Sequence, residues 1–116
     1  MGFQIGATLL DACVLSVLSN EDAYGYVLTQ CLQDAFSISE STLYPVLRRL
    51  QKDECLETYD QPYMGRNRRY YKITDKGMAQ LEQYQQDWKV FRDGIDGFLG
   101  DTDTLKLIKK EEELDE

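Results

Sequence analysis

The sequence predicts a mostly helical α+β fold in one domain that carries a C-terminal extension. Apolar residues recur at helical spacing in three successive segments before residue 53, and two short segments near residues 55–74 read as β-strands. A long helical pattern follows, from residue 75 to about residue 100. With 116 residues, 42% of them hydrophobic, the chain can bury one core.

The composition disfavours several function classes. The chain has no histidine, the commonest general base and metal ligand, and no phosphate-binding or nucleophile-elbow motif, so we expect no enzyme, cofactor or metal site. Cys13, Cys31 and Cys55 are widely spaced and lie in apolar patterns, which predicts buried, reduced thiols. No apolar run approaches the ~20 residues that cross a bilayer. No basic residue precedes the apolar N-terminus, so we expect a cytoplasmic protein with no membrane partner.

Two helices are expected before residue 35. The first runs from Ile5 to Leu18. The second begins near Asp22 or Ala23, where "SNED" supplies turn and cap residues. Its predicted core stripe is Tyr24, Val27, Leu28, Cys31 and Leu32. Gly25 inside this pattern marks either close packing with another element or an ordinary surface glycine.

The segment "SISESTLYPVLRRLQKDE" predicts a third helix with two different faces. Pro45 is best tolerated near a helix start, which favours Ser41 over Ser39 as the N-cap. The predicted core stripe is Leu43, Val46, Leu47 and Leu50. The predicted outward face is Ser41, Tyr44, Pro45, Arg48 and Lys52. Such a helix contacts a core on one side and a polar partner on the other.

Two strands, "CLETYD" and "RRYYKIT", predict a β-hairpin closed by the longer loop "QPYMGRN". Ile73 marks the core face, which Arg69 and Tyr71 share and where they are expected to brace the hairpin. Arg68, Tyr70 and Lys72 are expected to point outward, with Arg66 and Asn67 at the tip.

Positive charge gathers in the third helix and the hairpin. The chain carries a formal net charge of -8, and its first basic residue is Arg48. Between Ser39 and Gly77, however, eight basic residues outnumber six acidic ones. An acidic body behind a basic patch favours a polyanionic partner at that patch alone.

The last helix is expected to begin at the N-cap Thr74, with Asp75 favourable in its first turn. Its apolar residues follow heptad steps of three and four: Leu81, Tyr84, Trp88, Phe91, Ile95 and Phe98. This narrow seam predicts a homodimer, and the alternative is an intramolecular seam against the first helix. The predicted organisation is a body at residues 1–74, a dimerisation helix at 75–100 and an acidic tail at 101–116.

This element order is that of a winged helix-turn-helix, with the third helix as recognition helix and the hairpin as wing. "STLYPVLRRLQKDECLE" followed by "GRNRRYYKITDKG" closely resembles the PadR family of bacterial transcriptional regulators, and "YGYVLTQCL" resembles the family's second helix. The likeness runs from about Leu9 to Leu99, and the single C-terminal helix resembles the family's short branch. Cys55 departs from the glycine that family members often have at the end of the turn after the recognition helix. The resemblance implies a homodimeric repressor of a roughly palindromic operator, which an effector releases in some members.

The expected function is therefore sequence-specific binding of double-stranded DNA. The expected DNA-binding residues are Ser41, Thr42, Tyr44, Pro45, Arg48 and Lys52 on the third helix, and Arg66, Asn67, Arg68, Tyr70 and Lys72 on the wing. The alternative is a winged helix used only for protein contacts, which the net charge of -8 supports.

Trp88, the only tryptophan, lies in the middle of the seam beside Tyr84 and Phe91. Core packing is one interpretation of these rings. The other is a gap across the dimer axis, lined by Tyr84, Trp88 and Phe91, that binds a planar aromatic effector.

Overall fold

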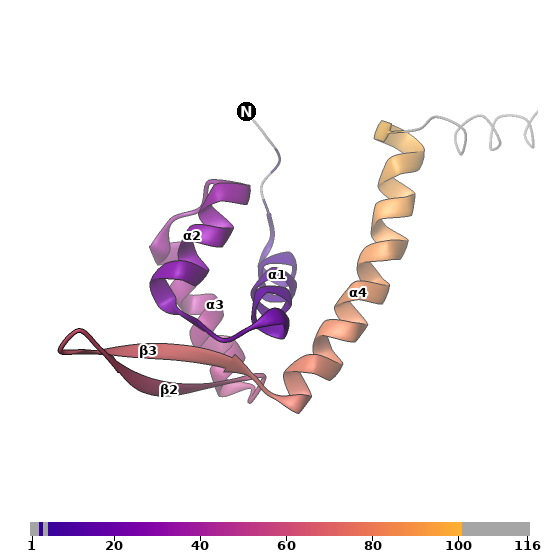
Figure 1. Ribbon diagram of the computed structural model, residues 1–116. Helices are drawn as coiled ribbons and strands as arrows, with labels where there is room; N and C mark the ends of the chain where they lie inside the picture. The colour runs from indigo at the N-terminus through magenta and orange to yellow at the C-terminus, as the bar shows by residue number, and fades with distance from the viewer. Residues whose placement is uncertain (1–2, 4, 101–116) are drawn as a thin grey trace, which may run out of the picture. The chain divides into compact units, whose positions relative to one another are not determined.

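The computed structural model describes residue 3 and residues 5–100 (Figure 1). The elements are α1 (Ala7–Asn20), β1 (Ala23–Tyr24), α2 (Gly25–Phe36), α3 (Glu40–Lys52), β2 (Leu56–Tyr63), β3 (Arg66–Ile73), α4 (Asp75–Ile95) and a π-helical turn, Asp96–Gly100. The described residues divide into two compact units, and the division falls within α4, between Glu82 and Gln83. The predicted domain boundary after residue 74 stays a prediction, and the predicted tail at 101–116 lies outside the described residues.

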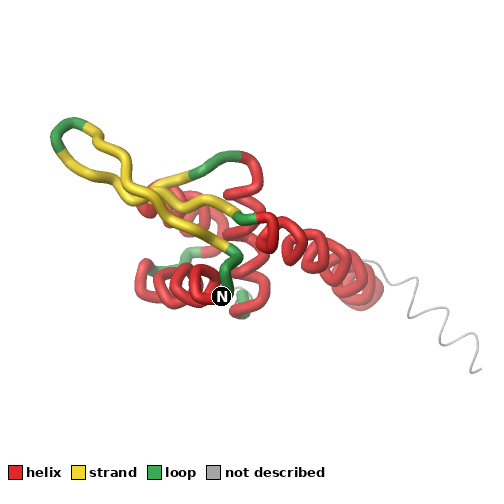
Figure 2. The backbone as a smooth tube through the Cα atoms, turned by 90° about the horizontal axis from the view of Figure 1, so that it is seen from below, coloured by secondary structure: helices red, strands yellow, loops and turns green. Residues whose placement is uncertain are grey.

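The strands form one antiparallel sheet in the order β1-β3-β2. β3 pairs with β2 along its whole length, from Leu56 opposite Ile73 to Tyr63 opposite Arg66. β1 pairs with β3 only at two positions, where Ala23 lies opposite Tyr71 and Tyr24 opposite Tyr70. The sequence did not predict β1, because two residues are too few to show an alternating pattern. The outer part of the hairpin extends beyond the helices (Figure 2).

The turn of the hairpin is shorter than predicted. Only Met64 and Gly65 separate β2 from β3, and both have positive φ, 49° and 80°. This is the backbone of a two-residue type I′ turn, which matches the twist of the flanking strands. The predicted longer loop is therefore wrong. Pro62 lies inside β2 instead of ending it, as an edge strand allows.

The core of the first unit comes from α1, α2, α3 and the start of β2. The predicted stripe of α3 is confirmed, since Leu43, Val46, Leu47 and Leu50 are all buried. The predicted stripe of α2 is only partly right. Its buried residues are Leu28, Thr29 and Leu32, whereas Val27 and Cys31 are exposed. Tyr24 belongs to β1 rather than to the helix, so the helical stripe is shorter than the sequence pattern suggested.

The three cysteines differ in environment. Cys55 is buried, Cys13 is half-buried and Cys31 is exposed, so the prediction of three buried thiols is wrong for Cys31. Burial raises the pKa of the Cys55 thiol and of the Cys13 thiol.

The start of α4 is fixed by contacts with the end of α3. The Gly77 amide donates to the Thr74 hydroxyl at 3.0 Å, which confirms Thr74 as the N-cap. The same hydroxyl donates to the Glu54 carbonyl at 2.6 Å. A Cβ atom on Gly77 would lie 2.3 Å from the Cys55 carbonyl oxygen, so only glycine fits this corner. The left-handed residue of the turn before β2 is Glu54, with φ 64°, and not Cys55.

No helix in the described part of the chain is long and apolar enough to cross a membrane.

Candidate nucleic-acid interface

The outward face of α3 is polar and accessible. All six residues of this helix that are expected to bind DNA are exposed: Ser41, Thr42, Tyr44, Pro45, Arg48 and Lys52. The opposite face is buried in the core, so α3 presents one continuous polar surface to solvent. Hydroxyl, phenol, guanidinium and ammonium groups on one exposed helix can hydrogen-bond base edges and phosphates.

The N-cap of α3 differs from the prediction. Ser39 is the cap, and its hydroxyl accepts a hydrogen bond from the Thr42 amide at 3.3 Å. The preference for Ser41 is therefore wrong. Pro45 lies in the second turn, where it deprives only the Ser41 carbonyl of a helical partner, and Ser41 is exposed to water. With this cap, Ser41 and Thr42 belong to the first turn of the helix, where their hydroxyls lie 2.9 and 3.1 Å from that of Ser39.

An ion pair joins α3 to α1. Arg49 donates a hydrogen bond to the carboxylate of Asp11, which is only 8% exposed. Neither Arg49 nor Asp11 was assigned a role from the sequence. A signal was available, because Asp11 is the only charged residue before Glu21 and lies in an otherwise apolar segment.

The register of the hairpin confirms the two predicted faces of β3. Ile73 lies opposite the buried Leu56, and Tyr71 opposite the buried Ala23, so these residues mark the core face. Arg66 and Asn67 are the first residues of β3 rather than part of the loop, and they lie at the outer end of the hairpin, directly after the turn. Arg66, Asn67 and Lys72 are exposed. Arg69 pairs across the hairpin with Asp60 at 3.6 Å and so does not brace it against the body.

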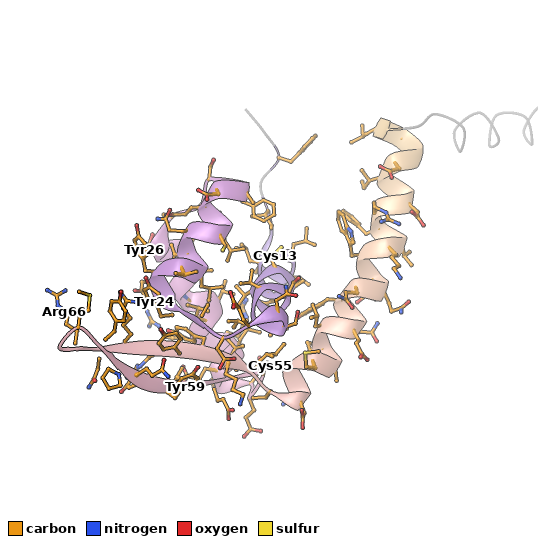
Figure 3. The ribbon with its side chains drawn as sticks, viewed as in Figure 1. Cys13, Tyr24, Tyr26, Cys55, Tyr59 and Arg66 are labelled. Carbon is orange, nitrogen blue, oxygen red and sulfur yellow. The ribbon has the colours of Figure 1, made fainter. Side chains whose placement is uncertain are left out.

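Arg68 and Tyr70 were expected to project freely into solvent. They are instead half-buried among tyrosines. The guanidinium of Arg68 lies 4.2 Å from the ring centroid of Tyr24 and 3.5 Å from that of Tyr63. Tyr70 stacks on Tyr59 with centroids 5.4 Å apart and meets Tyr24 edge-on at 5.7 Å. Figure 3 shows Arg66 towards the outer end of the hairpin, with Tyr24 and Tyr59 nearer the helices. The sequence could not reveal this cluster, since Tyr24 joins it only through the unpredicted β1.

The cluster ends in a hydrogen bond to the loop between α1 and β1. The Tyr59 hydroxyl donates to the Asp22 carboxylate at 2.7 Å. This hydrogen bond raises the pKa of Tyr59 to about 12, with smaller contributions from desolvation and from the charge of Asp22. The phenol therefore stays protonated, and able to donate, to a higher pH than that of an ordinary tyrosine.

A hollow of about 350 Å³ lies at the outer end of the hairpin, lined by Tyr63, Met64, Arg66, Asn67 and Arg68. Among the described residues, no cluster of cysteines or carboxylates is suited to holding a metal ion.

The predicted seam runs along α4 and ends at Phe98 in the π-helical turn, and it is apolar and largely exposed within a single chain. Leu81 is buried and Tyr84 half-buried. The remaining seam residues are 40–58% exposed: Trp88, Phe91, Ile95 and Phe98. Trp88 and Phe91 are in contact, with ring centroids 6.2 Å apart and planes tilted by 43°. Four large apolar side chains in one exposed row are unusual for a helix facing only water.

Comparison with known proteins places this architecture in a family. The model of the PadR-like transcriptional regulator family matches residues 14–83. An uncharacterized protein from Lysinibacillus sphaericus is 36% identical over 95 residues, which cover 78% of this chain and 87% of that protein.

Two crystal structures show the same fold. The fold of smu.1704 from Streptococcus mutans UA159 superposes with a TM-score of 0.80 at 39% identity, covering 86% of this chain and 94% of the other. A PadR-like transcriptional regulator from Bacillus cereus gives a TM-score of 0.73 at 37% identity, covering 78% and 91%. The fold is thus that of the PadR winged-helix regulators, and the chain belongs to the PadR-like family of transcriptional regulators.

Proposed function

We propose that this regulator is a homodimer that represses transcription by binding a roughly palindromic DNA operator. The observation that carries the proposal is the exposed polar face of α3 beside a basic hairpin, in a chain whose overall net charge is -8. An acidic protein that gathers more than half of its basic residues on these two elements is expected to approach DNA through them. Chromosomal DNA as the partner also places the protein in the cytoplasm.

The proposed surface divides by role. On α3, Ser41 and Arg48 are suited to reading base edges in the major groove. On the hairpin, Arg66 and Lys72 are suited to phosphates, and Asn67 to sugar or base edges in the adjacent minor groove. The remaining proposed contacts are Thr42, Tyr44, Pro45, Lys52, Arg68 and Tyr70.

Dimerisation would follow from the exposed seam of α4. A second copy offers the same heptad row, and pairing of two such rows removes Trp88, Phe91, Ile95 and Phe98 from water. Two-fold symmetry of the protein then matches two-fold symmetry of the operator, with recognition helices ~34 Å apart.

An effector could act at the same seam. Tyr84, Trp88 and Phe91 from two subunits would line a gap suited to a planar aromatic molecule. A molecule that binds the free dimer more tightly than the DNA-bound dimer shifts the population away from DNA.

Gel-shift titration against the promoter region of the protein's own gene tests the proposal. The wild-type protein is expected to bind with an affinity that falls steeply with salt. Arg48→Ala is expected to alter preference among sequences, whereas Arg66→Ala lowers affinity and reduces the salt slope by ~1. Lys89→Ala on α4 is the matched control, since it removes one exposed positive charge that is not part of the proposed surface.

A module that docks its basic hairpin on an acidic protein and does not bind DNA is the second candidate, since the net charge of -8 opposes binding to a long polyanion such as DNA. The same titration separates the two. Binding to promoter DNA no tighter than to unrelated DNA would favour the protein partner, as would an unchanged salt slope in Arg66→Ala.

A further inference from the structure

We propose that Tyr24 and Tyr63 clamp the guanidinium of Arg68, and that this clamp holds the outer hairpin in a fixed position against the body of the first unit. Tyr24 and Tyr63 are then positioning residues for Arg66 and Asn67, and they also hold Arg68, which is itself one of the proposed DNA contacts. The effect on DNA rests on the proposed function, whereas the effect on the hairpin itself does not.

The clamp joins two parts of the sheet that the backbone does not connect directly. Tyr24 belongs to β1, the strand that leads into α2, and Tyr63 is the last residue of β2 before the turn. Arg68 lies over both rings, at 4.2 and 3.5 Å from their centroids. It therefore links the far end of the hairpin to the start of a core helix.

A row of rings continues from the clamp into the body. Tyr24 meets Tyr70 edge-on, Tyr70 stacks on Tyr59 at an interplanar angle of 9°, and Tyr59 donates to Asp22. Residues directly opposite one another share a face of the sheet, so these rings and Arg68 all lie on the face away from the core. The row is anchored at Asp22, in the loop that follows α1.

The outer hairpin needs such support. β1 pairs with β3 only opposite Tyr70 and Tyr71, so the residues of β3 from Arg66 to Arg69 have β2 as their only neighbouring strand. An isolated two-stranded hairpin is marginal in water. Contacts between side chains must supply what a third strand would otherwise provide.

The chemistry of the clamp requires arginine. A guanidinium is planar and stacks on an aromatic face on either side, whereas the ammonium of lysine is a compact, strongly hydrated charge. Arg68→Lys therefore keeps the charge but loses most of the clamp. Tyr63→Phe keeps the ring, and Tyr63→Leu removes it.

The clamp borders the surface that it would position. Tyr63 lies directly opposite Arg66, and both line the hollow of about 350 Å³ together with Asn67 and Arg68. When Tyr63 is fixed against Arg68, the strand pair that presents Arg66 and Asn67 is fixed with it. A binding surface held in advance loses less entropy when DNA binds.

Amide hydrogen exchange of the full-length free protein tests the clamp without DNA. Tyr63→Leu and Arg68→Lys are each expected to speed exchange in residues 63–68 at least two- to five-fold, the range expected for the loss of one exposed cation–π contact. Tyr63→Phe is expected to match the wild type. Unchanged exchange in both Tyr63→Leu and Arg68→Lys would overturn the clamp.

Operator affinity of the same variants tests the positioning role. Tyr63→Leu and Arg68→Lys are expected to weaken operator binding by similar factors. The double variant is expected to bind no more weakly than the weaker-binding of the two single variants, because both substitutions disrupt the same clamp. Tyr63→Phe, which keeps the ring, is expected to bind the operator with the affinity of the wild type. Faster hairpin exchange with unchanged affinity in Tyr63→Leu would overturn the positioning role. A wild-type protein that binds no promoter DNA would instead refute the proposed function and leave the exchange result standing.

Discussion

Arg49 on α3 reaches across to Asp11 on α1 and forms an ion pair with it, although the two residues are 38 positions apart in sequence. Asp11 is 8% exposed, and the Arg49 side chain is 42% exposed. The carboxylate is thus withdrawn from water while the guanidinium remains partly solvated. Since Arg49 adjoins Arg48, this pair fixes the helix that carries the proposed base-reading residues.

Loss of this guanidinium should destabilise the protein. Arg49→Met removes a charged donor from a buried carboxylate, and we expect a loss of about 1–3 kcal/mol in the free energy of unfolding, measured by urea denaturation. Arg48→Met is the matched control on the same helix, exposed in the wild type, with an expected change within about 0.5 kcal/mol. Equal urea midpoints for the two variants would show that Asp11 does not depend on Arg49.

Gly77→Ala should be strongly destabilising for a steric reason. The added Cβ would lie 2.3 Å from the Cys55 carbonyl oxygen and 2.7 Å from Cγ1 of Ile73, and one of these contacts is with backbone. Overpacking of this kind costs about 1–3 kcal/mol or more. Gly94→Ala in the same helix is the control, because no atom lies within 4 Å of its added Cβ. There alanine should gain about 0.5–1 kcal/mol. Similar thermal midpoints for the two variants would contradict the close approach.

The hydrogen bond between Tyr59 and Asp22 should be visible in a pH titration. The folded pKa of Tyr59 is about 12, above the ordinary value of 10, because the protonated phenol donates to Asp22. Its contribution to stability is therefore complete below pH 10 and is lost as the pH rises through about 12.

Ring-carbon NMR of the tyrosines measures this directly. In Asp22→Asn the late titration of Tyr59 is expected to move back towards the ordinary range, because the charged acceptor is gone. Asp60→Asn removes the charge of the neighbouring carboxylate in β2 and should leave the raised pKa of Tyr59 unchanged. A Tyr59 titration unaffected by Asp22→Asn would show that the hydrogen bond to Asp22 does not raise the pKa of Tyr59.

Local signals made much of this fold predictable. The buried stripe of α3 follows from helical spacing alone. The start of α4 follows from Thr74, whose hydroxyl caps the helix by accepting from the Gly77 amide three residues later. The exposed polar face of α3 follows from the same spacing, so the main candidate surface could be located without a structure.

The rest depends on contacts distant in sequence. The two-residue β1 exists only because β3 pairs with it, and without β1 nothing brings Tyr24 to Arg68. A longer loop was predicted because Pro62 usually forms turns. A proline is tolerated inside β2 because that strand lies at the edge of the sheet. The cap at Ser39 was missed because Pro45 is acceptable in a second turn that faces water.

The seam of α4 gives a prediction about oligomeric state. Phe91→Asp and Ile95→Asp each place a charge in the expected contact between two helices, where burial of an unpaired carboxylate is costly. Sedimentation should then show monomers. Val90→Asp is the control, since Val90 adjoins Phe91 in sequence but is 76% exposed and lies off the seam. Folded dimers in both seam variants would remove the seam from the dimer interface.

The fluorescence of Trp88 can test the proposed effector gap, because Trp88 would itself line that gap. Trp88 is the only tryptophan, is 43% exposed in the single chain and contacts Phe91, so its fluorescence reports on this part of the seam. If two copies of the helix meet here, a flat cationic ring could stack between the paired side chains, and each aromatic pair would add ~0.5–1.5 kcal/mol.

Titration with planar cationic dyes should therefore quench Trp88 fluorescence and weaken binding to the operator. A wedge between the last helices changes the separation of the two recognition helices, which must stay ~34 Å apart to engage both half-sites. In Trp88→Ala, operator release by the dye should be lost while sedimentation still shows a dimer. Val90→Ala, one exposed position outside the seam, should respond like the wild type. If no planar compound perturbs Trp88 at sub-millimolar concentration, the tryptophan serves packing alone, and control of this regulator lies elsewhere in the chain.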